Sequence, residues 1–265
     1  MSHLSEAILH DTTGITLTLH DASIAAMLRD YADFFVIDAA SRPFSAQMIQ
    51  SIIHAARDVP VLVRTENCLP STLQGYLNLG VDGLILTDIN HAAEAEKAIA
   101  ACLYPPEGVR HYRVATPADK VSLQALNDQI TLIVEITSQQ AITQISEICE
   151  VTGINGVLVS PSRIAVALER HFDVDDDHVQ ASLRQVHVAA HGYELPFGLE
   201  GDGFDCTAGF TMNLRDVDLL AYGLEYGIKT GSVRVLSPEG TAFGAQNIAE
   251  EQEDDSFGMS LVATR

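Results

Sequence analysis

Positive charge is scarce in this sequence. Its 265 residues include only 15 lysines and arginines against 36 aspartates and glutamates, which gives a formal net charge of −21. The only lysines are Lys97, Lys120 and Lys229. Nucleic-acid binding requires a basic face, and anionic membrane surfaces repel an acidic chain. We therefore expect no nucleic-acid and no membrane partner. The acidity indicates either a salty habitat or simply an acidic surface.

Long apolar runs and paired cysteines are also missing. No run approaches the roughly 18 residues of a membrane helix. The opening residues, MSHLSEAILHDTTG, lack a basic region followed by an apolar one, so we expect no signal peptide. The cysteines are far apart and form no C-x-x-C pair, which indicates reduced thiols: Cys68, Cys102, Cys149 and Cys206. These features predict a cytoplasmic protein.

Several catalytic signatures are absent as well. There is no G-x-G-x-x-G after the first expected strand and no P-loop, which argues against a dinucleotide or nucleoside-triphosphate enzyme. G-x-S-x-G is missing and no histidine is near Ser41 in sequence, so Ser41 is a weak nucleophile candidate. A Schiff-base mechanism would rest on Lys229 alone. His187 and His191 are four residues apart on an expected helix but lack a third metal ligand.

What the sequence does contain is a repeated entry into a buried strand. Gly80-Val81-Asp82-Gly83 leads into three apolar residues, and Gly153-Ile154-Asn155-Gly156 does the same further along. After the first copy, residues 92–103 have an apolar stripe at the spacing of a helix. That helix must end before Pro105 and Pro106, because proline cannot continue it. The repetition predicts a chain built from strand–helix units.

Hydrophobic patterning predicts the following order of elements. Strands are expected at residues 15–20, 34–38, 59–64, 83–86, 131–136, 156–159 and 195–199. Helices are expected at 21–28, 45–56, 70–79, 92–103, 119–127, 142–151, 180–191 and 216–226. Several strands recur at about 24 residues, the length of one unit of a (β/α)8 barrel, although a doubly wound open sheet uses similar units.

Polar residues at the strand ends favour the barrel. Asp38, Arg64, Thr87, Thr137 and Ser160 each follow or close an apolar strand, and in a barrel all of them would converge on one mouth. We expect a single (β/α)8 TIM-barrel domain over residues 1–230. Residues 231–265, which include an acidic cluster between 250 and 255, are expected to form an irregular acidic tail.

These motifs resemble the HpcH/HpaI family of class II 2-oxo-acid aldolases, which includes citrate-lyase-like barrels. The strongest match is Gly80 to Arg110, where G-x-x-G, A-E-A-E and Y-P-P-x-G-x-R occur in family order. The V-R strand end at Arg64 and residues 141–161 also match. The resemblance covers residues 34–226 and implies a (β/α)8 barrel, usually a hexamer with an exchanged C-terminal helix. Here the C-terminal tail departs from the family.

The resemblance also implies a chemistry: a divalent cation held by Glu and Asp polarises a 2-oxo acid, an arginine stabilises the enolate, and a His–Asp pair moves the proton. Most of these residues are replaced here. The two metal ligands fall on Thr137 and Arg163, the base histidine on Ser41 and its assisting aspartate on Asn78, while Asp38 and Arg64 match. We therefore predict no metal site and no cofactor, with Mg²⁺ or Mn²⁺ retained only if displaced ligands such as Glu135 and Glu66 hold it.

Each remaining candidate has a functional and a structural interpretation. Arg64 either binds a carboxylate or enolate, or pairs with Asp38 or Glu66. Arg163 either replaces the charge of the cation and holds an anion, or pairs with Glu135. Glu135 is either a general base with a raised pKa or a structural partner of an arginine. Asp38 either orients water or a neighbouring residue at the mouth, or caps a turn.

Three functions follow from these alternatives. The first is a metal-independent carbon–carbon lyase acting on a small 2-oxo acid or carboxylate, with Arg64, Asp38 and Glu135 catalytic. In that hypothesis Arg64, Arg163, Ser160 and Thr137 bind the substrate. The second is an inactive pseudoenzyme that serves as a binding or assembly module. The third is a metal-dependent aldolase with displaced ligands. By family analogy the protein is expected to be a homo-oligomer, either a hexamer or a dimer.

Overall fold

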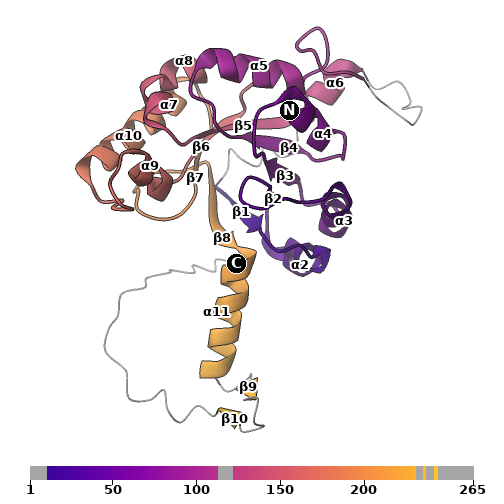
Figure 1. The fold of residues 1–265 in the computed structure, drawn as a ribbon, viewed down its shortest axis with the longest axis vertical. Coiled ribbons are helices and arrows are strands. Elements are labelled where there is room, and N and C mark those ends of the chain that lie inside the picture. Colours follow the sequence, from indigo (N-terminus) through magenta and orange to yellow (C-terminus); the bar gives the residue numbers. More distant parts are fainter. Residues whose placement is uncertain (1–10, 113–121, 231–234, 237–241, 244–265) are drawn as a thin grey trace. The chain divides into compact units, whose positions relative to one another are not determined.

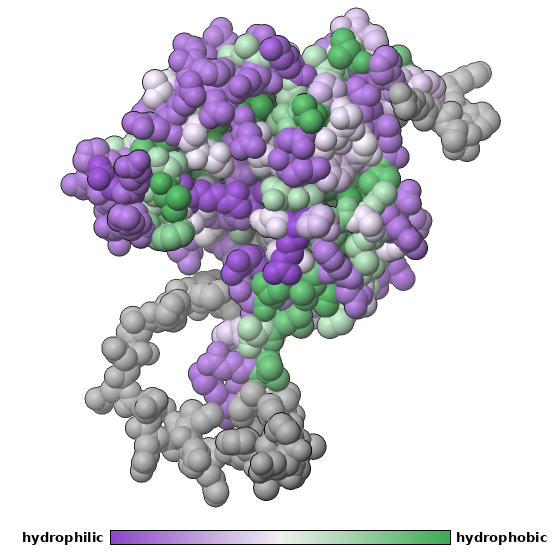
Figure 2. Space-filling model, in the orientation of Figure 1, coloured by the Kyte–Doolittle hydropathy of each residue, from purple (hydrophilic) through white to green (hydrophobic). Residues whose placement is uncertain are grey.

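The structure is a computed structural model that describes residues 11–112, 122–230, 235–236 and 242–243 (Figure 1). The chain divides into two compact units, Met1–Val217 and Asp218–Arg265. In the face shown in Figure 2, hydrophilic residues dominate the surface over α7 and α8, as the acidic composition leads one to expect.

The first unit is a closed barrel of eight parallel strands. Each strand pairs with the next, and β8 pairs with β1 to close the ring. The predicted (β/α)8 barrel is therefore confirmed. The strands are β1 (Thr12–Leu17), β2 (Phe34–Asp38), β3 (Val61–Arg64), β4 (Gly83–Leu86), β5 (Thr131–Ile136), β6 (Gly156–Val159), β7 (Phe197–Leu199) and β8 (Phe210–Arg215).

Helices surround the strands (Figure 1). They are α2 (Ala22–Leu28), η1 (Arg29–Tyr31), α3 (Ala46–Ala56), α4 (Pro70–Leu77), α5 (Ala92–Cys102), α6 (Leu123–Asn127), α7 (Gln139–Thr143), α8 (Ile145–Cys149), α9 (Pro161–Ala167) and α10 (Asp177–Gly192). The Asp21 and Ser45 side chains accept hydrogen bonds from the N–H groups of Ser23 and Met48, and so cap α2 and α3.

Several elements differ from the prediction, and the first of them is β1, which spans Thr12–Leu17 and not residues 15–20. The helix expected at 142–151 is broken at Gln144 into α7 and α8. A short helix, α9, follows Ser160, where the sequence suggested only a Ser-Pro turn; proline at the first helical position favours helix entry. Strand β8 was not predicted, although Phe210 and Met212 alternate with polar residues.

The barrel interior is filled by side chains from alternate strand positions. Its buried cluster consists of Phe34, Val36, Leu62, Ile85, Ile133, Leu158, Phe210 and Met212. Gly198 also faces this cluster, because a Cβ atom at that position would lie within 2.6 Å of three atoms of the Phe210 ring. The lower part of the barrel is thus a packed core, and a ligand site can lie only towards its mouth.

The repeated Gly-x-Asp/Asn-Gly motif has the same structural role in both copies. The Asp82 carboxylate accepts a hydrogen bond of 2.8 Å from the Val61 N–H, and the Asp82 N–H donates to the Val61 carbonyl at 2.9 Å. Asn155 repeats this pair at Leu132, with distances of 2.7 Å and 2.8 Å. Each motif therefore fastens the start of its own strand to the start of the preceding one.

The Asp82→Asn substitution is expected to maintain or raise stability at neutral pH. Desolvation raises the pKa of Asp82 despite its backbone hydrogen bonds, so ionisation of this group disfavours the folded state. An amide oxygen performs the same role at Asn155. Thermal denaturation at pH 7 should show an unchanged or higher Tm for Asp82→Asn and a lower Tm for Asp82→Ala. A fall of similar size in both variants would contradict this interpretation.

The second unit is described only in part. Helix α11 (Asp216–Lys229) directly follows β8 in sequence and supplies most of the described residues of this unit. Strands β9 (Val235–Leu236) and β10 (Ala242–Phe243) form an antiparallel pair within the segment expected to be irregular. The rest of the expected tail, including its acidic cluster, lies outside the described residues. Lys229 lies in the last turn of α11, where its Nζ is 2.7 Å from Oε1 of Glu225.

Within the part of the chain that the structure describes, no helix has the length and apolar character that crossing a membrane requires. All four cysteines are free thiols, and desolvation raises the pKa of Cys68, Cys102 and Cys149 to between about 11 and 12. Burial therefore keeps these thiols protonated and poorly nucleophilic.

Candidate active site at the barrel mouth

Strand alternation brings a set of polar side chains to the carboxyl end of the barrel. Each lies two residues beyond an interior core position, and so points in the same direction. Asp38, Arg64 and Glu135 lie two residues after the core residues Val36, Leu62 and Ile133, respectively. Glu200 lies two residues after Gly198, immediately beyond the end of β7. Since parallel strands all end on one side, these groups meet above the packed core.

Arg64 is the centre of this group. Its side chain has no exposed surface, and its guanidinium forms a bidentate pair with Glu200, at 3.0 Å from Nη1 to Oε1 and 2.7 Å from Nη2 to Oε2. Its Nε lies 3.3 Å from Glu135 and its Nη1 lies 3.7 Å from Asp38. Desolvation lowers the pKa of Arg64, but the three carboxylates outweigh it, so the net shift is upward.

Glu135 lies between two guanidinium groups. It has no exposed surface, and its Oε1 accepts a hydrogen bond of 3.0 Å from Nη1 of Arg163. Its Oε2 is close to Nε of Arg64, but the two atoms are not aligned for a hydrogen bond. Desolvation raises the pKa of Glu135, and the two arginines offset this only in part. Glu135 is therefore a buried carboxylate that retains its proton more readily than an exposed one.

Arg163 is the more accessible of the two arginines. Its side chain is 36% exposed, and it lies in the first turn of α9. Its contacts with described residues are the hydrogen bond to Glu135 and a 3.8 Å approach of Nε to Glu200. A guanidinium has five N–H donors in a planar fork, so Arg163 retains donors for an anionic ligand.

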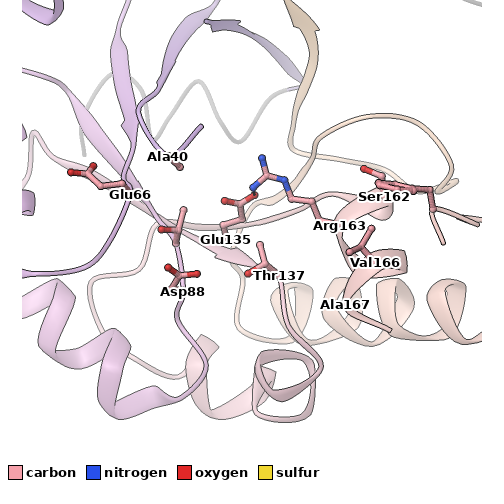
Figure 3. Close-up of a pocket in the computed structure, with 11 residues that line it drawn as sticks. Ala40, Glu66, Asp88, Glu135, Thr137, Ser162, Arg163, Val166 and Ala167 are labelled. Atoms are coloured by element: carbon pink, nitrogen blue, oxygen red, sulfur yellow. Dashed lines mark hydrogen bonds and ion pairs between the residues drawn. The ribbon is translucent and has the colours of Figure 1, made fainter. Parts of the chain in front are cut away.

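A cavity of about 540 Å³ opens at this place (Figure 3). Glu135 and Arg163 meet in its middle, with Glu66 and Asp88 on one side and Val166 and Ala167 on the other. The lining residues are Ala40, Glu66, Thr87, Asp88, Glu135, Thr137, Ser162, Arg163, Val166, Ala167 and Phe172. The volume is sufficient for a small organic acid.

The predicted site residues are thus distributed over two layers. Glu135, Thr137 and Arg163 line the cavity, whereas the Arg64–Glu200 pair lies outside its lining. Asp38 accepts hydrogen bonds from the Ser41 hydroxyl at 2.7 Å and its N–H at 3.1 Å, so it caps the turn after β2. Ser160 is buried and is not among the residues that line the cavity. Its hydroxyl is 3.1 Å from that of Ser162, which does line the cavity.

The sequence interpretation overlooked Glu200. Of the two structural partners that the sequence suggests for Arg64, Asp38 does lie 3.7 Å from its Nη1, whereas Glu66 accepts a 2.7 Å hydrogen bond from the Tyr76 hydroxyl. The bidentate partner of Arg64 is 136 positions away in sequence. The available signal was the same as for the other strand ends, since Glu200 is a charged residue directly after an apolar strand.

The donor set at this site does not fit a hard divalent cation. Such ions are held by several carboxylate oxygens. The positions that the resemblance assigns to metal ligands are Thr137 and Arg163, and the carboxylates of Glu135 and Glu200 are paired with guanidinium groups. No group of three or more His, Cys, Asp or Glu among the described residues is arranged to hold a metal.

Comparisons with known proteins give a consistent result. A family model described as HpcH/HpaI aldolase/citrate lyase matches residues 21–196. A 5-keto-4-deoxy-D-glucarate aldolase of Escherichia coli is 28% identical over an alignment that covers 63% of this chain and 68% of the enzyme.

Two solved structures show the same fold. A HpcH/HpaI aldolase/citrate lyase family protein from Burkholderia cenocepacia has a TM-score of 0.79 at 20% identity, covering 88% of this chain and 100% of its own. A HpcH/HpaI aldolase from Desulfitobacterium hafniense has a TM-score of 0.77 at 21% identity, covering 90% and 97%.

Proposed function

Because the chain belongs to the HpcH/HpaI aldolase/citrate lyase family, we propose that it acts on a small 2-oxo acid as a carbon–carbon lyase that needs no metal. The observation that carries the proposal is the contact between Glu135 and Arg163 in the cavity. It places a proton acceptor with a raised pKa beside a partly exposed guanidinium. Enolate chemistry requires these two elements together: a base, and a fixed positive charge.

In the proposed reaction the substrate is a 4-hydroxy-2-oxo acid. The Arg163 guanidinium binds the carboxylate and the neighbouring keto oxygen. Glu135 takes the proton of the 4-hydroxyl group, the C3–C4 bond breaks, and an aldehyde leaves. The electron pair of that bond forms the enolate of the remaining 2-oxo acid, whose oxygen faces Arg163. Protonated Glu135 then returns its proton to C3, which restores the carboxylate and releases the product.

Arg64 has a positioning role in this proposal. Its side chain is buried, and its three carboxylate partners leave it no access to the cavity in this arrangement. It holds Glu135 and Glu200 in place beneath Arg163. Arg64 therefore does not contact the enolate directly, as the sequence suggests, but acts on it indirectly through Glu135.

Enolisation of pyruvate provides a test that does not require the natural aldehyde. In D₂O containing a chelator, the protein is expected to exchange the C3 protons of pyruvate for deuterium faster than buffer does, measured by loss of the methyl NMR signal. Arg163→Ala should reduce this rate by about 10²-fold or more, because it removes the charge that stabilises the enolate. Exchange that appears only when Mg²⁺ or Mn²⁺ is added would overturn the metal-independent proposal.

A binding module without catalysis is the second candidate. This candidate is favoured by the surroundings of Arg64. Its guanidinium is paired with three carboxylates, and together these groups resemble a structural ion cluster. This candidate predicts a pyruvate-dependent rise in Tm that Arg163→Ala abolishes, together with no deuterium exchange above the buffer rate. The same two measurements therefore separate the lyase from the binding module.

A further inference from the structure

The outer wall of the cavity is apolar. Val166 and Ala167, on α9, line it together with Phe172 in the loop that follows. Val166 is 49% exposed and Phe172 is 71% exposed. Because exposed apolar side chains around a cavity gain from being covered, this wall favours a ligand that carries an apolar group.

The backbone that carries Phe172 is strained. Glu169, His171 and Phe172 have φ values of 60°, 49° and 67°, in the left-handed region that bulky residues rarely adopt. The loop is held by the Arg170 N–H, which donates to the Ala165 carbonyl at 2.8 Å, and by the 3.5 Å pair of Arg170 with Asp176. Strain of this kind is often retained where a side chain must be presented to a ligand.

The opposite wall is acidic. Figure 3 shows Glu66 and Asp88 on the side of the cavity facing away from Val166 and Ala167. Among the described lining residues, Arg163 is the one cation. One ligand carboxylate can pair with Arg163, but a second would meet carboxylates or an apolar wall and would lose its hydration without a partner.

We propose that the substrate is a 2-oxo monocarboxylate with an aliphatic or aromatic tail, and that Val166 and Phe172 select it by covering the tail. This inference rests on the proposed function and narrows it, since that function alone would also accept a dicarboxylate or a polyhydroxylated acid. The E. coli relative named above acts, by its name, on a keto-deoxy derivative of glucarate. The tail proposed here is of a different chemical class.

Thermal-shift titrations with a matched ligand series test the selection. The series is pyruvate, 4-methyl-2-oxopentanoate, phenylpyruvate and 2-oxoglutarate. A fully buried methylene is worth about fourfold in affinity, so the three additional carbons of 4-methyl-2-oxopentanoate against a half-open wall should tighten binding on the order of tenfold over pyruvate. We expect at least that gain for phenylpyruvate, whose tail is larger, and no gain for 2-oxoglutarate.

The double variant Val166→Ser with Phe172→Asn should abolish the gain and leave the affinity for pyruvate within about twofold. Asparagine is chosen because it tolerates positive φ, so the loop can keep its conformation. Val188→Ser is the matched control, since Val188 is 68% exposed on α10 and does not line the cavity. It should keep the full gain.

The outcomes separate the two proposals. If pyruvate binds through Arg163 but the tailed acids bind no more tightly, or if 2-oxoglutarate binds best, the selection of an apolar tail is wrong and the lyase proposal is unaffected. A gain that persists in the double variant also overturns the role of Val166 and Phe172. If none of the four acids shifts the Tm, both proposals fail.

Discussion

Replacing Arg64 with methionine is expected to destabilise the barrel by about 3–5 kcal/mol, the usual cost of removing one partner from a buried ion pair. Methionine has a similar length and packs well, so the loss would reflect charge and not a cavity. Asp38, Glu135 and Glu200 would lose the guanidinium that now contacts all three. Chemical denaturation at pH 7.5 measures the loss, which corresponds to a fall in Tm of about 10 °C.

Arg170→Met provides the control for this experiment. The Arg170 side chain is 40% exposed, and its Nε lies 3.5 Å from the carboxylate of Asp176. Exposed pairs of this type contribute at most about 1 kcal/mol. If the two substitutions were to cost the same, the cluster around Arg64 would not be the electrostatic centre of the mouth.

The pH dependence of the Arg64→Met effect has a definite sign. Once Arg64 is removed, buried carboxyl groups are less costly in the protonated form, so the folded variant binds protons more tightly than its unfolded chain. Its free energy of unfolding therefore falls as pH rises. The difference from the natural protein should be smaller at pH 5 than at pH 7.5. A difference that is constant with pH would indicate a packing effect.

The elements that could be predicted were those with a local signal. The buried runs of β2 and β5 and the cap residues Asp21 and Ser45 defined their elements closely. The resemblance to the HpcH/HpaI family, drawn from Gly80–Arg110, is confirmed by the family model. Strand β8 was missed because only half of its residues are apolar and a loop rich in glycine and aspartate precedes it.

The composition of the site was only partly predictable. Convergence of Asp38, Arg64 and Glu135 follows from strand direction and alternation, so the sequence was sufficient for it. The sequence was not sufficient to predict that one arginine is buried and the other accessible. That difference depends on Glu200, which accepts two hydrogen bonds from Arg64 from across the barrel. Distant pairing of this kind is set by the closure of the sheet and has no local signature.

Glu135→Gln is expected to have the largest effect on activity, a loss of about 10²–10⁴-fold in deuterium exchange into pyruvate. The amide cannot accept the proton, but its oxygen can still accept the hydrogen bond of 3.0 Å that Arg163 donates to Oε1. Pyruvate should therefore still raise the Tm of this variant, so that loss of catalysis is distinguished from loss of the pocket.

Glu66→Gln is the matched control for Glu135→Gln. Glu66 also lines the cavity, but it is exposed and its carboxylate accepts a hydrogen bond from Tyr76. No arginine contact with Glu66 is found among the described residues, and the reaction proposed above assigns it no proton. Exchange should change by no more than a few-fold. An equal loss in both variants would show that negative charge in the cavity, and not a base at position 135, is what matters.

The pH profile of exchange links this effect to the buried position of Glu135. Only the ionised carboxylate accepts a proton, so the rate should rise with pH and level off above the pKa of Glu135. Desolvation raises that pKa against the opposing effect of Arg64 and Arg163, so the rise should be centred above the ordinary range of an exposed glutamate. In Glu135→Gln the residual rate should lack this rise. A profile that is the same in both proteins would assign the base to another group, and a natural protein that binds pyruvate without exchange would identify the barrel as a binding module.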